Sequence, residues 1–274
     1  MGIGWRIDEL LDGASLEDVC AWIENHDDWG RTPAQIVRRF GSDAQAGDFV
    51  WTRDTAGRYL LGRITGGYRY DISEAAKKVD VHQVRDVKWA PRPLNDLEVP
   101  GGVIRRFIGV GQSFSRIHDV PAQMLTPYLW AKLNGEPLPE LDMTKDDVLT
   151  SHLDPYDVED LVYVWLQLAR DYVALPRARQ RDTPAYEWTM IHRDSRRKGI
   201  VQIKTGNDEV DLQALSDARV DELTDTFAFA TCGHYSGSHD LVTEVIKGED
   251  LLAFVTAEPD LLPLRVRTMF ELAK

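Results

Sequence analysis

The sequence predicts two folded domains: an N-terminal α+β domain built on a small β-barrel, and a C-terminal α/β domain with the element order αββαββα. Residues 47–89 alternate short apolar runs with turn residues, which is typical of antiparallel strands. Residues 157–255 alternate helical and strand periodicities, which is typical of a layered α/β domain. The chain has 274 residues, 43% of them hydrophobic, so it is long enough to form two cores.

The N-terminal part begins with helical patterns and continues with strands. Ser15 is a helix-capping residue type, and apolar residues recur at helical spacing after it, so we expect a helix over 15–23. Thr32 and Pro33 predict the start of a second helix, which continues to Phe40. The expected strands of the barrel are 48–52, 59–65, 68–70 and 81–89.

The middle of the chain favours a connector. Prolines and glycines interrupt every periodic pattern between 91 and 139, and residues 140–160 hold eight acidic residues against one Lys. A short helix is expected near 121–133. We therefore expect a first domain at 1–120, an acidic connector at 121–152 and a second domain at 153–274.

The C-terminal part predicts a strand pair between helices. Apolar residues from Val158 to Ala169 recur at helical spacing, so we expect a helix over 157–172, with Asp154-Pro155 at its start. The other expected elements are strands 186–191 and 200–204 joined by a basic turn at 194–199, a helix over 212–223, strands 226–231 and 242–246, and a helix over 249–255.

Three polar side chains are expected to meet on this strand pair. Side chains alternate across a strand, so Gln202 and Lys204 share one face, and Glu187 can join that face from the neighbouring strand. A hard cation takes oxygen ligands, so Glu187 and the Gln202 carbonyl could hold Mg²⁺, or Mn²⁺, together with substrate phosphate oxygens. Lys204 could then orient the attacking water and stabilise negative charge in the transition state.

The charge of the chain is uneven. The net charge of −13 counts against bulk attraction to nucleic acid, which needs clustered Lys and Arg. Residues 177–204, however, hold eight basic residues against three acidic ones, a local excess of five positive charges. A solvated loop and hairpin turn would explain this excess equally well. From this cluster we expect contacts to nucleic acid at Arg179, Arg181, Arg196, Arg197 and Lys198.

The C-terminal residues resemble the PD-(D/E)XK nucleases, in particular the Mrr-like restriction endonucleases, whose last motif is Gln-x-Lys. The resemblance covers about 153–256, with Val201-Gln202-Ile203-Lys204-Thr205-Gly206 as the signature strand and Thr183-Pro184-Ala185-Tyr186-Glu187 before it. It implies a restriction-endonuclease-like fold and a catalytic set of Glu159, Glu187, Gln202 and Lys204. This sequence departs from the family because the usual Asp before the hairpin is a Glu, with Asp182 as a competing carboxylate, and because Gln202 lowers the negative charge at the metal.

The N-terminal residues resemble the PUA-like barrels of the EVE type that occur in modification-dependent restriction proteins. The matching stretches are Gly47-Asp48-Phe49-Val50-Trp51, the run 59–70 and the run 82–89, and the resemblance covers about 1–120. Ile3-Gly4-Trp5 corresponds to a loop after a first strand, and we expect that strand to be absent. Such barrels hold an extruded base between aromatic faces. The candidates here are Trp5, Trp51, Tyr68, Tyr70 and Trp89, each of which could instead pack in the barrel core.

Other classes of site have little support in the sequence. Cys20 and Cys232 are the only cysteines, too few for a disulfide framework or a zinc site. No apolar run is long enough to span a membrane, and the N-terminus lacks the apolar core of a signal peptide, so we expect a cytoplasmic protein with no membrane partner.

These observations favour a metal-dependent DNA endonuclease of the restriction or defence type, whose barrel selects DNA, with a modified base as one option. The first alternative is a nucleic-acid-binding module whose second domain is structural. The second alternative is a nucleotide-signal-gated effector. Cleavage of both DNA strands would favour a homodimer. The sequence leaves open DNA versus RNA, the base recognised and the position of cleavage.

Overall fold

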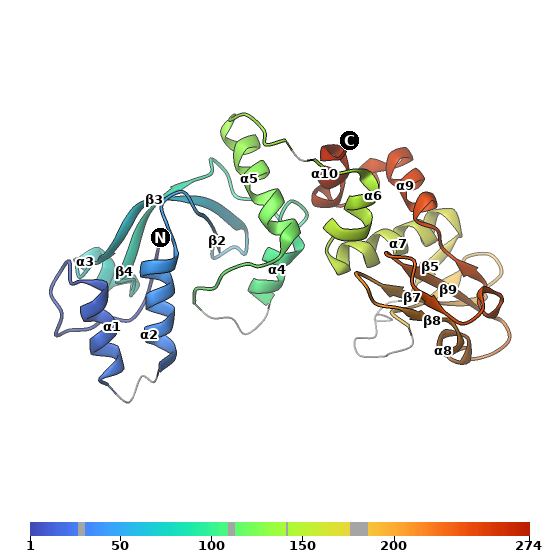
Figure 1. The fold of residues 1–274 in the computed structure, drawn as a ribbon, viewed down its shortest axis with the longest axis horizontal. Helices are drawn as coiled ribbons and strands as arrows, with labels where there is room; N and C mark the ends of the chain where they lie inside the picture. The colour runs from blue at the N-terminus through green and yellow to red at the C-terminus, as the bar shows by residue number, and fades with distance from the viewer. Residues whose placement is uncertain (27–30, 109–112, 141, 176–185) are drawn as a thin grey trace. The chain divides into compact units, whose positions relative to one another are not determined.

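The computed structural model describes residues 1–26, 31–108, 113–140, 142–175 and 186–274 (Figure 1). The chain forms two compact units, Met1–Pro139 and Glu140–Lys274. Their boundary falls inside the segment 121–152 that we expect as a connector. Among the described residues, no helix is both long and apolar enough to cross a lipid bilayer.

The first unit is built on a curled antiparallel sheet whose strand order is β1-β4-β3-β2 (Figure 1). Its strands are β1 (Gly2–Ile3), β2 (Phe49–Arg53), β3 (Tyr59–Tyr70) and β4 (Gln83–Trp89). Strands β1 and β2 are its two edges, so the described strands form a half-barrel. The sequence also led us to expect no first strand, but Gly2 and Ile3 pair with Val84 and Gln83 of β4.

Local hydrogen bonds explain where the elements of this unit begin. The Ser15 hydroxyl accepts a hydrogen bond from the Asp18 amide at 3.1 Å, which caps α1 as expected. The β2–β3 turn is closed by Asp54, whose carboxylate accepts hydrogen bonds from the amides of Ala56 and Arg58. The helices are α1 (Leu16–Glu24), α2 (Arg31–Arg38), the π-helical turn η2 (Arg39–Asp43), α3 (Glu74–Val79), α4 (Gly101–Ile108) and α5 (Val120–Asn134).

Helix α5 belongs to the first unit and not to a connector. The Trp51 indole on β2 donates a hydrogen bond to the Thr126 hydroxyl on α5 at 3.1 Å. The rings of Phe49 and Trp130 lie 5.8 Å apart, centroid to centroid. Helix α5 was expected from the sequence, but its packing against β2 depends on contacts 75 or more residues apart, which sequence periodicity does not report.

The second unit contains a five-stranded mixed sheet of order β11-β9-β7-β6-β5. Strands β5, β6 and β7 pair antiparallel, whereas β9 is parallel to β7 and β11 is parallel to β9. The bounds are β5 (Tyr172–Ala174), β6 (Trp188–His192), β7 (Lys198–Lys204), β9 (Thr224–Ala230) and β11 (Glu244–Val245). A separate short pair joins β8 (Val210–Asp211) to β10 (Tyr235–Ser236).

Helices cover both faces of this sheet, with α7 on one face and α8 on the other (Figure 1). The helix expected over 157–172 is α7 and ends at Ala169, because Asp171 has a left-handed backbone (φ 57°) from which β5 starts. Strand β5 and helix α10 were not predicted. The helical segments are α6 (Lys145–Asp147), η3 (Val148–His152), α7 (Pro155–Ala169), α8 (Leu212–Asp217), η4 (His239–Leu241), α9 (Gly248–Ala257), η5 (Pro259–Leu261) and α10 (Leu264–Leu272).

Candidate functional site

The structure brings Glu187 and Lys204 together, as the strand alternation predicts. Trp188 pairs with Val201 in the antiparallel β6–β7 ladder, so the preceding Glu187 stands opposite Gln202. The Glu187 amide donates a hydrogen bond to the Val201 carbonyl at 2.7 Å, which continues the ladder. The Lys204 ammonium Nζ lies 3.7 Å from the Glu187 carboxylate oxygen Oε1. Both side chains are partly exposed, so each can reach a ligand in solvent.

These residues lie on the face of the sheet that carries α8. Gln202 pairs with Ala228, and Lys204 with Ala230, along the parallel strands β7 and β9. Ala228 and Ala230 pack in one apolar cluster with Leu212 and Leu215, which belong to α8. Gln202 is only 3% exposed, so its side chain is buried, whereas those of Glu187 and Lys204 are partly exposed.

Helix α7 carries the fourth expected residue, Glu159, on the opposite side of the sheet. Tyr163, one turn further along α7, stacks on Trp188 with ring centroids 5.1 Å apart. Trp188 points to the face opposite Glu187, because side chains alternate along a strand. The structure therefore assembles the expected catalytic set only in part: three residues share one face, and Glu159 belongs to the helix of the other face.

The described residues offer few ligands for a metal at this position. No group of three or more His, Cys, Asp and Glu side chains that could hold an ion occurs in the described part of the chain. Glu187 provides one carboxylate and Gln202 one amide. This set fits Mg²⁺ only if water and substrate phosphate complete the shell, which is common because Mg²⁺ keeps several waters and binds through one or two carboxylates. Asp182, the competing carboxylate, lies outside the described residues.

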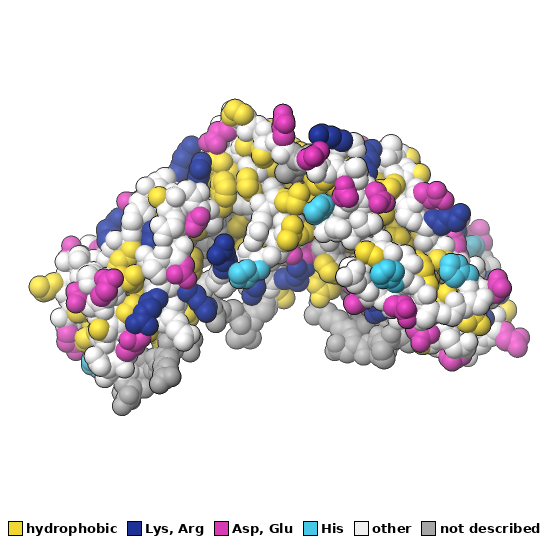
Figure 2. All heavy atoms as spheres, in the orientation of Figure 1, with side chains coloured by type: hydrophobic (Ala, Val, Ile, Leu, Met, Phe, Trp, Pro, Cys, Tyr) yellow, Lys and Arg dark blue, Asp and Glu magenta, His cyan; other side chains and the backbone are white. Residues whose placement is uncertain are grey.

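Acidic residues from other strands and loops neutralise most of the basic turn. Arg193 pairs with Asp171, Arg197 with Asp225 and Lys198 with Asp221. Arg197 and Lys198, which the sequence predicts to contact nucleic acid, are thus ion-paired within the second unit, Arg197 with a mostly buried carboxylate and Lys198 with a half-exposed one. On the face shown in Figure 2, acidic side chains are scattered over the second unit. Arg196 stays exposed, and Arg179 and Arg181 lie outside the described residues.

The Arg197–Asp225 pair is the centre of a buried polar cluster. The Tyr172 hydroxyl also donates to the Asp225 carboxylate, which is only 8% exposed as a residue. The hydrogen bond from Arg197 holds the pKa of Asp225 below its usual range. Burial raises the pKa of Tyr172, and its bond to Asp225 adds to this effect. The cluster therefore acts in folding and locks Arg197 in place.

Two of the five aromatic candidates for base stacking belong to the core of the first unit. Tyr70 is 1% exposed, and its hydroxyl accepts a hydrogen bond from the Ile7 amide and donates one to the Ile7 carbonyl. Tyr68 is partly buried against the same core, its hydroxyl donates to the Gln83 side chain, and burial raises its pKa. Tyr70 leaves no ring face for a base and is corrected to a core residue.

The three tryptophan candidates, Trp5, Trp51 and Trp89, differ in their contacts and in their exposure to solvent. Trp5 packs against the core cluster, and Trp51 is hydrogen-bonded to α5. Trp89, at the end of β4, is 37% exposed. Its ring lies over Gly62, where a Cβ atom would come 2.7 Å from Cε3 of the indole. Trp89 thus has one face on the sheet and keeps exposed surface, which makes it the best-placed of the five for stacking.

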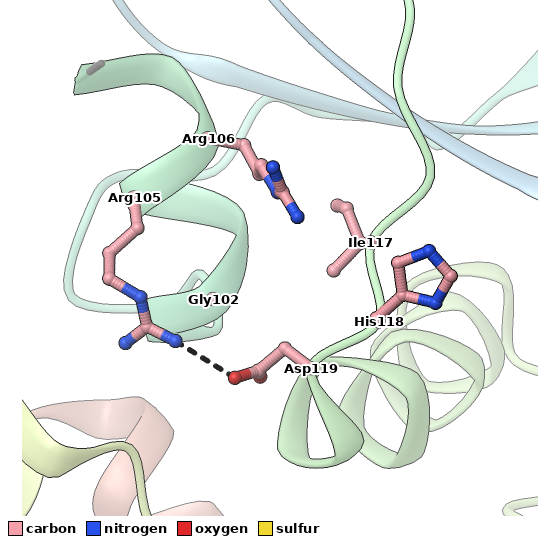
Figure 3. Close-up of a pocket in the computed structure, with 6 residues that line it drawn as sticks. All are labelled: Gly102, Arg105, Arg106, Ile117, His118 and Asp119. Carbon is pink, nitrogen blue, oxygen red and sulfur yellow. Dashed lines mark hydrogen bonds and ion pairs between the residues drawn. The ribbon is translucent and has the colours of Figure 1, made fainter. Parts of the chain in front are cut away.

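A basic cavity in the first unit was not foreseen from the sequence. Arg105 and Arg106 on α4 face the segment Ile117 to Asp119 that leads into α5, around a cavity of about 380 Å³ (Figure 3). Arg105 forms an ion pair with Asp119 at 2.9 Å, and Asp119 also caps α5. The Arg105-Arg106 pair was the only hint in the sequence, and α4 itself was hidden by the surrounding Gly and Pro residues.

Comparison with protein-family models gives a match within the first unit. Residues 1–99 match a family model described as a domain of unknown function (DUF8426). The matched residues include the half-barrel sheet and the helices α1, α2 and α3. The chain matches no curated protein and no solved structure.

Proposed function

We propose that the second unit is a Mg²⁺-dependent phosphodiester hydrolase that cleaves DNA, of the restriction type. The observation that supports this proposal is the Glu187–Lys204 pair, 3.7 Å apart at one end of the β6–β7 ladder with Gln202 beside it. One face of the strand pair carries a carboxylate, an amide and an ammonium. These groups suit a reaction in which a phosphate must be positioned and its negative charge stabilised. The resemblance to Mrr-like endonucleases rests on the same three residues.

Each residue has a distinct part in the proposed reaction. Mg²⁺, when bound, would neutralise charge on the scissile phosphate. Glu187 and the Gln202 carbonyl would hold it from the strand side. Lys204 would orient the water whose oxygen attacks phosphorus and would stabilise the charge that builds on the phosphate oxygens as the P–O bond breaks.

The first unit is proposed to contact the DNA target, with Trp89 as the stacking residue. An exposed indole can stack on a base at about 1–3 kcal/mol per base, whatever its sequence. A modified base is one target that such a surface could select. Arg106 at the cavity of Figure 3 is exposed and suited to a backbone phosphate.

Nicking of supercoiled plasmid would test the proposed hydrolase. Purified full-length protein is incubated with modified phage DNA and unmodified plasmid, with Mg²⁺ or EDTA. We expect nicking that needs the metal and that is lost in Lys204→Ala. Lys198→Ala is the matched control, because Lys198 lies on the same strand but pairs with Asp221. Equal nicking by the Lys204→Ala variant and the wild type would remove Lys204 from the mechanism.

One observation favours a second candidate, a nucleic-acid-binding protein without cleavage activity. The described residues provide a single carboxylate at the site, and a group of three metal-binding side chains is missing from the described ranges. In that case the protein should bind DNA with the same affinity in Mg²⁺ and in EDTA and leave plasmid intact.

A further inference from the structure

A second cavity, of about 450 Å³, lies where the parallel strands β7 and β9 end. The carboxyl ends of parallel strands are where open α/β sheets bind ligands. The volume lies within the range of small-molecule pockets, about 300–1,000 Å³. The residues that line it are Leu149, Thr150, Ser151, Leu153, Pro155, Val158, Thr205, Gly206, Asn207, Thr231 and Cys232.

The lining combines an apolar wall with uncharged polar groups. Leu149 comes from η3, Leu153 from the short link after it, and Pro155 and Val158 from the start of α7. The polar groups are hydroxyls, one carboxamide and one thiol. No side chain with a formal charge occurs among the described residues that line it. A phosphate or carboxylate would find no matching charge there, so the lining favours a neutral ligand with an apolar face and a polar edge.

The Thr231 hydroxyl is the observation that points to a ligand. Thr231 is 8% exposed, and its Oγ1 has no hydrogen-bond partner among the described residues. Leaving a buried hydroxyl unsatisfied costs about 1–3 kcal/mol, so such a group in a cavity wall usually serves a ligand or an ordered water. Asn207 also lines the cavity, and its carboxamide can both donate and accept a hydrogen bond.

This cavity is separate from the Glu187–Lys204 pair. Lys204 pairs with Ala230 across the parallel strands, so Thr205 and Thr231 are the next residues and point to the other face. That face carries α7, whose residues Pro155 and Val158 line the cavity. The two sites are nevertheless adjacent, because the Thr231 amide donates a hydrogen bond to the Lys204 carbonyl at 3.0 Å.

We propose that this cavity binds an uncharged nucleoside through its base. A flat heterocycle matches the apolar wall of Leu149, Leu153 and Val158. The edge of a base presents adjacent donors and acceptors, which a carboxamide such as Asn207 can meet in pairs. The Thr231 hydroxyl then gains the partner that it lacks. Occupancy of the cavity would hold the end of β7, and with it the backbone of Lys204, in one position.

Calorimetric titration of the full-length protein tests the site directly. The probes are adenosine, guanosine, cytidine and thymidine, with orthophosphate as the charged comparison. We expect saturable binding of at least one nucleoside and none of orthophosphate. The Thr231→Val variant keeps the side-chain shape and removes the hydroxyl, so it should bind that nucleoside about fivefold or more weakly. The Thr256→Val variant, on α9 outside the cavity lining, is the matched control and should bind as the wild type does.

Three outcomes would overturn the proposal: no nucleoside binds at millimolar concentration, orthophosphate binds instead, or Thr231→Val and the wild type bind equally. Cys232 provides a second measurement, because it is exposed and lines the cavity whereas Cys20 is buried. Saturating nucleoside should slow alkylation of Cys232 at least threefold under native conditions. An unchanged alkylation rate in the presence of a nucleoside that binds would place it elsewhere on the protein and overturn the assignment of this cavity. None of these measurements depends on DNA cleavage.

Discussion

Arg197 and Asp225 form a two-point ion pair, with Nε 2.8 Å from Oδ2 and Nη2 2.6 Å from Oδ1. The two residues are 28 positions apart, at the starts of the neighbouring strands β7 and β9. This geometry fixes both side chains and is among the stronger forms of hydrogen bonding between charged groups. Arg197 therefore holds two strands together, although its surroundings in the sequence favour nucleic-acid contact.

Asp225→Asn should destabilise the second unit by about 2 kcal/mol at pH 7, because the charged bonds to Arg197 weaken at a mostly buried position. The folded-state pKa of Asp225 is lowered, so its contribution is complete above the unfolded pKa of about 4 and is lost as pH falls through the folded pKa. Urea unfolding at pH 7 and at pH 3 measures the difference between variant and wild type. That difference should shrink at pH 3.

The matched control for this pair is its neighbour Arg196, which is exposed and for which no acidic partner is found among the described residues. Arg196→Ala should leave the urea midpoint within about 0.5 kcal/mol of wild type. If Arg196→Ala and Arg197→Ala lowered the midpoint equally, the ion pair would not explain the stability.

Lys204→Ala should leave the fold intact and abolish metal-dependent nicking, because a partly exposed Lys at a strand end contributes charge and little core volume. The free energy of unfolding should change by less than about 1 kcal/mol, since solvent-accessible ion pairs contribute little. Circular dichroism with urea titration checks the fold, and plasmid nicking checks the activity. If the Lys204→Ala variant unfolds, Lys204 is required for the stability of the fold.

Glu187→Gln should weaken Mg²⁺ binding as well as nicking, because a neutral amide replaces the single described carboxylate at the site. Titration of nicking rate against Mg²⁺ concentration would show a midpoint raised about tenfold or more. If Asp182→Asn has this effect and Glu187→Gln does not, the metal is held by the other carboxylate.

Tyr70→Phe should destabilise the first unit by about 1–2 kcal/mol without changing DNA affinity. The change leaves the Ile7 amide and carbonyl without their buried partner. Thermal unfolding and binding of a fluorescent oligonucleotide measure the two effects. A loss of DNA affinity in a variant that stays folded would return Tyr70 to the binding surface.

Trp89→Ala should have the opposite effects to Tyr70→Phe: little loss of stability and weaker DNA binding. Its partly exposed ring contributes less to the core, so stability should change by less than about 1 kcal/mol. Loss of one base stack should weaken oligonucleotide binding about tenfold. The same two measurements apply, with Tyr70→Phe as the matched aromatic change. Unaltered binding by Trp89→Ala would show that this indole does not meet the bases.

Some of the local elements of this protein follow from its sequence, although α4, β5 and α10 do not. The Ser15 cap and the Asp154-Pro155 start of α7 depend on residues within about one turn of each other, and the strand pair around Glu187 and Lys204 depends on one hairpin. The sequence predicts each of them. The alternation of side chains along β7 was also sufficient to place Gln202 and Lys204 on one face.

Only the tertiary structure shows which polar and aromatic side chains already have a partner elsewhere in the chain, and on which face of the sheet each one lies. Tyr70 meets Ile7 from 63 positions away, Arg197 meets Asp225 across a parallel strand pair, and Glu159 is carried by the helix on the other face of the sheet. A short stretch of sequence shows which charged and aromatic residues are present. It does not show the distant residues that neutralise or bury them. The free energy of a hydrogen bond or ion pair depends on distance and burial in space, and those quantities exist only once the chain has folded.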